Sequence, residues 1–140
     1  MQSRFAAGPG SADARLSAVN TAAALDAIRA FVAAWNSHEP AQVAAAIHFP
    51  QVRLADGKFE MWPSAEEFLK GSEPGRQRTW FETRIDRTRV VQVSPNGVNV
   101  TASISHFDRR GQVLSQDEGL FLVVLRGGAW KVQARSMMGT

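Results

Sequence analysis

The sequence predicts an α+β fold in which three N-terminal helices pack on a strongly curved antiparallel sheet. Two observations predict this class. Helical patterns occupy the first half of the chain, to about Gly71, whereas residues 79–138 form four consecutive strand patterns joined by turns rich in glycine. A chain of 140 residues is long enough for one domain with a single core. We expect residues 1–18 to be a flexible leader and residues 19–140 to be that domain.

The first predicted helix begins at Asn20 or Thr21, because these side chains can accept hydrogen bonds from the first helical amides. Apolar side chains then recur at the spacing of one helix face, at Ala24, Leu25, Ile28, Phe31, Val32 and Trp35. Proline is favoured in the first turn of a helix, so Pro40 predicts a second, shorter helix that ends at Ile47.

A β-hairpin and a third helix are predicted next. Asp56-Gly57 lies between the apolar segments 52–54 and 58–62, and this dipeptide is a strong signal for a tight hairpin turn. Ser64 and Glu67 have the spacing of a capping box, in which a serine and a glutamate satisfy each other's backbone amides. The third helix is therefore expected to begin at Ser64.

The rest of the chain is predicted to form four strands, over residues 79–94, 98–107, 112–126 and 130–135. Apolar and polar residues alternate in the second of them, which places His106 on the same face as Val98 and Val100. The third contains a continuous apolar run from Leu120 to Leu125, which needs cover on both faces of the sheet. We therefore expect the outer face to pair with a second copy of the chain in a homodimer.

Composition argues against several classes of function. The chain has no cysteine, which excludes disulfides and thiolate nucleophiles, and its three histidines are too widely spaced to suggest a zinc site. The net charge is only +3, and carboxylates interrupt the arginines of residues 76–89, so we expect no nucleic-acid groove. No glycine motif for phosphate or dinucleotide binding occurs, and we expect no cofactor.

The sequence also carries no signal for a membrane or for secretion. No apolar run approaches the ~20 residues that a spanning helix needs. The first residues lack the apolar stretch of a signal peptide. We expect a cytoplasmic protein without membrane contact.

The order of the predicted elements and several local strings resemble the nuclear transport factor 2 superfamily. These strings are residues 36–38 (NSH), 48–54 (HFPQVRL), 87–92 (RTRVVQ) and 130–136 (WKVQARS), and they look like a bacterial branch of it. The resemblance covers about residues 20–138 and implies the cystatin-like cone, with helices packed on a bent sheet around a pocket. The superfamily includes ketosteroid isomerases and SnoaL-like polyketide cyclases.

The resemblance implies a small hydrophobic or carbonyl-containing ligand, with two possible functions. One is cofactor-free proton transfer next to a carbonyl; the alternative is a non-catalytic binding or dimerisation module, because this fold supports both. Two departures bear on the choice. Ketosteroid isomerases use a tyrosine in the oxyanion hole, and this chain has none. The similar branch is expected to have His-Ser shortly after the aromatic residue at Trp80, where this chain has Phe81-Glu82-Thr83.

Three residues are candidate catalytic groups. His48, at the end of the second predicted helix, could act as a general acid or base at the pocket rim, or be a packing histidine. His106 could act as a base inside the cone, or be a core histidine with satisfied hydrogen bonds. Only one of Asp117 and Glu118 can point inward, because neighbouring strand residues face opposite ways, and an inward Asp117 could serve as the base.

Five further residues are candidate ligand contacts. Trp62 and Trp80 could form pocket walls, whereas Trp35 at helical spacing fits the core better. Arg53 could orient the ligand, and Glu82, a carboxylate on the sheet, is a further candidate contact. Arg135 could hold a substrate carboxylate, or pair with a sheet carboxylate such as Asp117 or Glu82. The sequence leaves these alternatives open.

Overall fold

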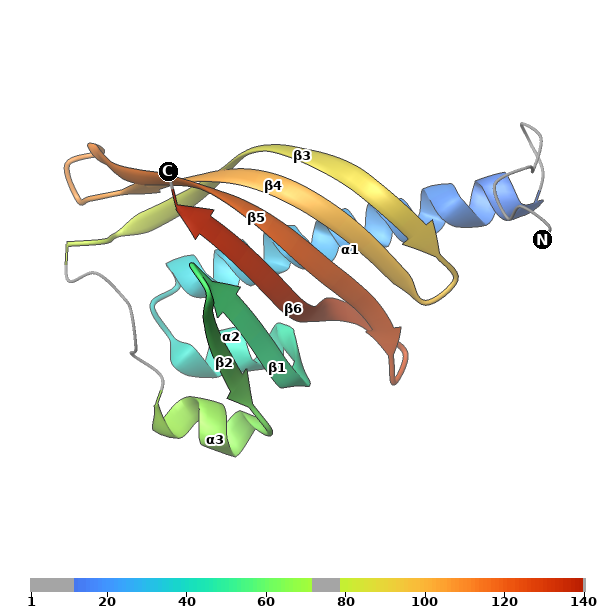
Figure 1. Cartoon of the computed structure of the whole chain (residues 1–140), viewed down its shortest axis with the longest axis horizontal. Coiled ribbons are helices and arrows are strands. Elements are labelled where there is room, and N and C mark those ends of the chain that lie inside the picture. The colour runs from blue at the N-terminus through green and yellow to red at the C-terminus, as the bar shows by residue number, and fades with distance from the viewer. Residues whose placement is uncertain (1–11, 72–78, 140) are drawn as a thin grey trace.

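The computed structural model describes residues 12–71 and 79–139 (Figure 1). The elements in chain order are α1 (Ala12–Asn36), α2 (Pro40–Ala45), β1 (Ile47–Ala55), β2 (Lys58–Trp62), α3 (Ala65–Lys70), β3 (Glu82–Ser94), β4 (Gly97–Phe107), β5 (Val113–Arg126) and β6 (Ala129–Gly139). The predicted α+β class is confirmed. Residues 1–11 of the predicted leader lie outside the described residues, whereas Ala12 to Ala18 belong to α1.

A six-stranded sheet in the order β2-β1-β6-β5-β4-β3 curves around α1 (Figure 1). The prediction of a purely antiparallel sheet is wrong, because β1 runs parallel to β6. The other neighbours pair in antiparallel fashion. The parallel pair joins the β1–β2 hairpin to the long strands, so segments from both halves of the chain form one concave face.

The prediction of three helices packed in the concavity is also corrected. One long helix, α1, packs on the sheet, whereas α2 and α3 are six-residue helices beside the β1–β2 hairpin. Helix α1 begins well before the N-cap predicted at Asn20. The Asn20 side chain instead donates hydrogen bonds to the carbonyl oxygens of Ser94 and Pro95, at 3.3 and 3.2 Å. This contact ties α1 to the β3–β4 turn.

Two local predictions are confirmed. Asp56 and Gly57 have positive φ angles of 54° and 81°, as a type I′ hairpin turn between β1 and β2 requires. Ser64 Oγ accepts a hydrogen bond from the Glu67 amide at 3.2 Å and so caps α3. Both features hold the hairpin and α3 in a fixed relation at one end of the sheet.

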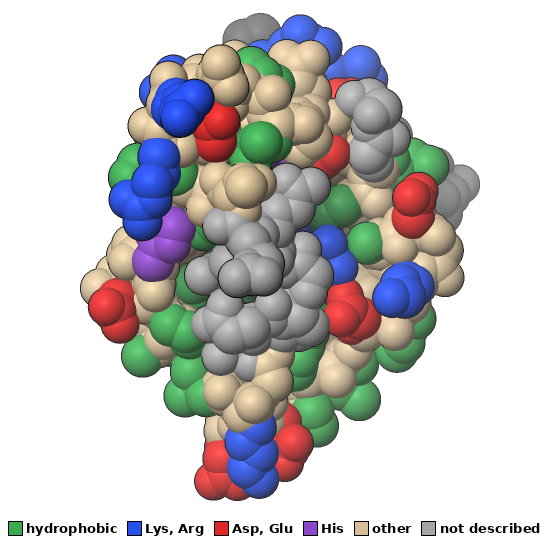
Figure 2. All heavy atoms as spheres, turned by 90° about the vertical axis from the view of Figure 1, so that its left-hand side faces the viewer, with side chains coloured by type: hydrophobic (Ala, Val, Ile, Leu, Met, Phe, Trp, Pro, Cys, Tyr) green, Lys and Arg blue, Asp and Glu red, His purple; other side chains and the backbone are tan. Residues whose placement is uncertain are grey.

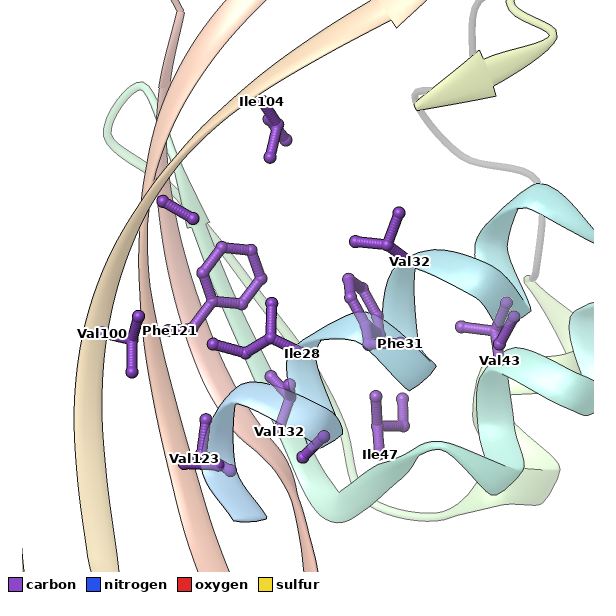
Figure 3. Packing of buried hydrophobic residues seen from close by; sticks show 14 of the residues in the cluster. Ile28, Phe31, Val32, Val43, Ile47, Val100, Ile104, Phe121, Val123 and Val132 are labelled. Carbon is purple, nitrogen blue, oxygen red and sulfur yellow. The ribbon is translucent and has the colours of Figure 1, made fainter. Parts of the chain in front are cut away.

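The core lies between α1 and the concave face of the sheet (Figure 3). Ile28 of α1 lies beside Phe121 of β5 in this view, and both side chains are 1% exposed. The predicted alternation in β4 is confirmed, since Val98, Val100, Ala102 and Ile104 are all buried. In β5 the apolar run divides between the faces: Phe121 and Val123 are buried, and Leu120, Leu122 and Val124 are partly exposed on the convex side.

The length and composition of helix α1 bear on the expectation that the chain has no membrane-spanning segment. By length and composition its residues 14–36 could cross a bilayer. The apolar face of α1, however, is occupied by the sheet, with Ala24, Ile28 and Phe31 buried there. Packing in a protein core therefore accounts for the apolar character of this helix.

Candidate active site

A cavity of about 130 Å³ lies between the C-terminal part of α1, the β1–β2 hairpin and the sheet. Its apolar walls include the aromatic rings of Phe31, Trp35, Trp62, Phe68 and Phe121. Its polar lining consists of Arg53, Glu60, Thr83, His106, Asp117 and Arg135. Five of the eight predicted site residues line this cavity: Arg53, Trp62, His106, Asp117 and Arg135.

His106 and Asp117 form a pair at the end of the cavity away from the β3–β4 turn. They lie on neighbouring strands, where Ile104 of β4 is opposite Asp117 of β5, and His106 is one inward position further along. His106 Nε2 lies 2.9 Å from Asp117 Oδ2, and the side chains are 19% and 22% exposed. Glu118 points to the other face and accepts a hydrogen bond from Ser103. The inward carboxylate is therefore Asp117.

The second ring nitrogen of His106 is held by Thr83 of β3. His106 Nδ1 lies 2.7 Å from Thr83 Oγ1, which also accepts a hydrogen bond from Trp80 Nε1 at 2.9 Å. The backbone of Thr83 is fixed in turn by Asn36 at the end of α1, whose side chain bonds both the amide and the carbonyl of Thr83 at 2.8 Å. The imidazole is thus oriented by three elements of the fold.

These contacts fit one arrangement of hydrogen bonds, in which Asp117 accepts and His106 is a neutral imidazole. An ionised Asp117 can only accept, so the proton between the two groups is assigned to His106 Nε2. The Trp80 indole can only donate, so Thr83 Oγ1 accepts from it and is free to donate its own proton to Nδ1 of a neutral imidazole. Both histidine nitrogens are then engaged. Oδ2 of Asp117 receives the histidine proton, and Oδ1 has no hydrogen-bond partner among the described residues.

Arg135 of β6 has no ion pair or hydrogen bond through its side chain within the described part of the chain. Its guanidinium carbon lies over Phe31, 5.0 Å from the ring centroid, and 5.9 Å from that of Trp35. The pKa of Arg135 is lowered to about 9, mainly because burial disfavours the charged form and also because Arg53 is nearby, whereas Glu60 acts in the opposite direction. The predicted pairing of Arg135 with Asp117 or Glu82 does not form.

Arg53 lines the cavity but its charge is already compensated. Arg53 Nη1 lies 2.6 Å from Glu60 Oε1, across the β1–β2 hairpin, where these residues are direct partners. Each side chain is 31% exposed. The pair is a cross-strand ion pair at the cavity wall, so Arg53 is held in place more than it is available to a ligand.

Three predicted site residues lie elsewhere. His48 is not at a helix end but in β1, where its Nε2 lies 2.9 Å from the carbonyl oxygens of both Val124 and Ala129. It therefore secures β1 to the β5–β6 turn, which is the packing alternative. Glu82 pairs with Arg84 at 3.1 Å on the surface. Trp80 is buried and is not among the residues that line the cavity; its Nε1 donates a hydrogen bond to Thr83.

Sequence reasoning missed Asn36, Glu60 and the role of Thr83, and it favoured a core position for Trp35, which lines the cavity. Glu60 could have been found, because the Asp56-Gly57 turn fixes the register that places it opposite Arg53. Asn36 and Thr83 carry no local signal, since their contact joins residues that are 47 positions apart.

Figure 2 shows the end of the molecule that lies on the left in Figure 1. Lysine and arginine side chains alternate there with acidic and hydrophobic ones, so this face presents no continuous basic field. Among the described residues, no group of three histidines or carboxylates is placed to hold a metal ion. The polar groups at the cavity are those of the His106–Asp117 pair, Thr83, the Arg53–Glu60 pair and Arg135.

The fold defines the class of protein. Similar solved structures show that this chain has the cystatin-like fold of nuclear transport factor 2-like proteins, which confirms the resemblance predicted from the sequence at the level of the fold. No family model matches the chain, and no curated protein matches it in sequence.

Three of these structures illustrate the range. A ketosteroid isomerase-like protein from Erwinia carotovora atroseptica is 20% identical with a TM-score of 0.65, over 84% of this chain and 94% of that one. An NTF-2-like protein from Shewanella oneidensis is 12% identical with a TM-score of 0.68, over 85% and 98%. The hexachlorocyclohexane dehydrochlorinase LinA-type3 from Novosphingobium barchaimii is 15% identical with a TM-score of 0.70, over 91% and 90%.

Proposed function

We propose that this protein is a cofactor-independent enzyme that moves a proton at a carbon next to a carbonyl in a small molecule, with Asp117 as the base. The observation that carries the proposal is the contact of Asp117 with His106 at the cavity, 2.9 Å long. A carboxylate that is partly desolvated, oriented by one hydrogen bond and open on its other oxygen fits the role of a general base. His106 is a positioning residue in this scheme.

The proposed reaction balances without an added reagent. Asp117 takes a proton from the carbon beside the carbonyl, and the C–H electron pair becomes an enolate. When Asp117 returns the proton to a conjugated carbon, the product is an isomer of the substrate; when it returns the proton to the same carbon, the substrate or its epimer is formed. The cationic side chains of the cavity favour the negative charge that develops on the substrate oxygen.

The size of the cavity limits the substrate. Pockets for small molecules usually enclose about 300 Å³ or more. The cavity here is about 130 Å³, close to the ~150 Å³ of an engineered cavity that admits benzene. The substrate class proposed is therefore a single ring or a short chain, rather than a steroid or a polycyclic polyketide.

Two of the similar structures support this reaction class by their names. One is called ketosteroid isomerase-like and another a dehydrochlorinase. Loss of hydrogen chloride from a molecule removes a proton, so a positioned base suits both names. At these identities the likeness shows the fold, and the His106–Asp117 pair of this chain supplies the chemical argument.

The test is the conversion of cyclohex-3-enone to cyclohex-2-enone, which moves one proton from C2 to C4 and can be followed by ultraviolet absorbance. Deuterium uptake at C2, measured by NMR, detects proton abstraction even without net conversion. We expect Asp117→Asn to lower either rate by roughly 10²- to 10⁴-fold, the usual contribution of a positioned base.

Glu118→Gln is the matched control, because it changes the neighbouring carboxylate on the opposite face of the sheet. It should leave both rates within a factor of two of wild type, on the order expected for a residue outside the cavity. Equal loss in both variants, or wild-type rates no faster than the buffer, would count against Asp117 as the base.

We also propose that two copies of the chain associate through the convex face of the sheet. Three hydrophobic side chains on that face of the β1–β2 hairpin are well exposed: Leu54 at 42%, Phe59 at 66% and Met61 at 49%. Leu120 and Leu122 continue the apolar surface on β5. Light scattering should give twice the mass of the chain, and Phe59→Glu should shift it toward the monomer.

A further inference from the structure

We infer that Arg135 makes the cavity a binding site for small planar monocarboxylates, with the ligand carboxylate on its guanidinium and the ligand body between the aromatic walls. The inference rests on the cavity of the proposed function and specifies its substrate class. It begins from a guanidinium that faces an enclosed space and contacts rings instead of carboxylates. Arg135 is partly buried, and arginines removed from water are usually paired, so an unpaired one at a cavity indicates that its partner is a ligand.

Arg135 is the one cationic side chain of the cavity that has no carboxylate partner among the described residues. Arg53 is neutralised by Glu60 at 2.6 Å. Asp117 is hydrogen-bonded to His106 at 2.9 Å and must stay ionised to act as a base. Arg135 is the remaining cation of the polar lining, and Arg53 beside it makes its charge less favourable. A bound anion would remove that penalty, because an opposite charge stabilises the protonated guanidinium.

The geometry favours a carboxylate over a larger or more highly charged anion. The Phe31 ring lies against the guanidinium carbon at 5.0 Å, so one flat side of the group is covered. The N–H groups at its edge remain, and these match the two oxygens of a carboxylate in a planar, bidentate contact. A monoanion brings one negative charge to Arg135, whereas a phosphate dianion would bring a second charge into a cavity of about 130 Å³.

Arg135 of β6 and Asp117 of β5 enter the cavity from different levels of the sheet, as their partners across the two strands show. Arg135 pairs with Phe121 and Asp117 pairs with Gly139, so the two positions are four residues apart on that strand, roughly 13 Å at the usual rise of a β-strand. One side chain is long and the other short, and both reach the same cavity. A ligand anchored by its carboxylate on Arg135 would present its far end, not the carboxylate, to Asp117.

Benzoate and its neutral analogue benzamide are the probes that test this inference, because they share one shape and differ in charge. Binding to the full chain is measured at pH 7 by isothermal titration calorimetry. We expect wild type to bind benzoate at least tenfold more tightly than benzamide. Arg135→Met should abolish that preference, and Arg135→Lys, which keeps the charge but loses the planar fork, should retain part of it.

Arg89→Met is the matched control, since it removes the same charge from an exposed position on β3 and should leave the preference intact. If Arg135→Met does not fold, wild type alone still decides the question. Its affinity for benzoate should fall as the pH rises from 8 to 10, because the pKa of Arg135 is about 9, whereas binding of benzamide should not change. Equal binding of the two probes by wild type, or a benzoate preference that survives in Arg135→Met, would overturn the inference.

Asp117→Asn separates this inference from the proposed function. The variant should still prefer benzoate over benzamide, because it keeps Arg135, while proton exchange is lost. Benzoate binding without any proton exchange by wild type would refute the enzyme and leave a non-catalytic carboxylate-binding protein. Proton exchange without a benzoate preference would refute the carboxylate site and leave the base.

Discussion

The two ends of the concave face are built on the same strands but differ in what fills them. Toward the β3–β4 turn the inward residues are Val98 and Val100 of β4 and Val123 of β5, and each is fully buried. Toward the β4–β5 turn the inward positions of the same strands carry His106 and Asp117, which surround a cavity. The first end is a solid core covered by α1, and the second is a polar site.

The difference teaches how an alternating pattern can serve two purposes. The period of two continues unchanged along β4 and β5, so the backbone supplies equivalent inward positions from one end to the other. The transition occurs where bulk is missing. Gly119 is the inward residue between Phe121 and Asp117, and a Cβ there would lie 2.8 Å from Met137 Sδ and 2.9 Å from Phe121 Cε1. Core and site are therefore separated by one residue without a side chain.

The largest expected effect breaks the core end. Ile28→Ala removes a side chain that is 1% exposed and lies beside Phe121. We expect the free energy of unfolding to fall by about 2–5 kcal/mol, because the substitution loses apolar burial and leaves a void. Urea denaturation measures the change. A loss below about 1 kcal/mol would mean that this end is less tightly packed than its burial indicates.

Gly119→Ala tests the boundary between the two ends. The added methyl group must displace the tip of Met137 or the ring of Phe121, and Met137 lines the cavity. We expect a loss of about 1–3 kcal/mol from overpacking. Benzoate binding should weaken as well, because a displaced Met137 side chain would change the lining of the cavity. Gly71→Ala is the control for the change in stability, since nothing lies within 4 Å of the methyl position there.

Thr83→Val tests the site end with little change in shape. It removes the hydroxyl that bonds both His106 and Trp80, at 2.7 and 2.9 Å. We expect a loss of about 1–2 kcal/mol for two hydrogen bonds. As a positioning effect, proton exchange should slow without loss of benzoate binding, and Thr83→Ser should restore much of the rate. Loss of both properties would indicate a general disruption instead.

The smallest expected effect is a pH-dependent gap in stability between wild type and Arg135→Met. The pKa of Arg135 is lowered to about 9 by burial in the folded protein, whereas the unfolded chain keeps the usual high value. Above pH 9 the folded state releases a proton that the unfolded state retains, so wild type gains stability relative to the variant as the pH rises. The gain is at most about 1.4 kcal/mol per pH unit. Denaturation of both proteins at pH 8 and pH 9.5 measures it.

The fold was predictable because its main signals are local. Alternation placed His106 inward and showed that only one of Asp117 and Glu118 could point the same way, and the Asp-Gly turn defined the hairpin. The site was predictable only in part. The pairing of His106 with Asp117 depends on the register of two strands, and the alternation of each strand alone does not reveal it.

His48 shows the opposite failure. Its neighbours resemble the end of a helix, but α2 ends at Ala45 and the chain is already a strand at Ile47. Tertiary contacts with Val124 and Ala129, far along the sequence, decide its environment. Arg135 is a similar case, since only the assembled sheet shows that the expected carboxylate partners are out of its reach.

The position of β6 has a consequence for the order of synthesis. β6 follows the other five described strands in the chain, yet it lies between β1 and β5 and pairs with both. Until it emerges, the hairpin with Arg53 and the meander with His106 and Asp117 are separate pieces with open edges. The same strand brings Arg135. The cavity is therefore complete only when β6 has paired with both β1 and β5.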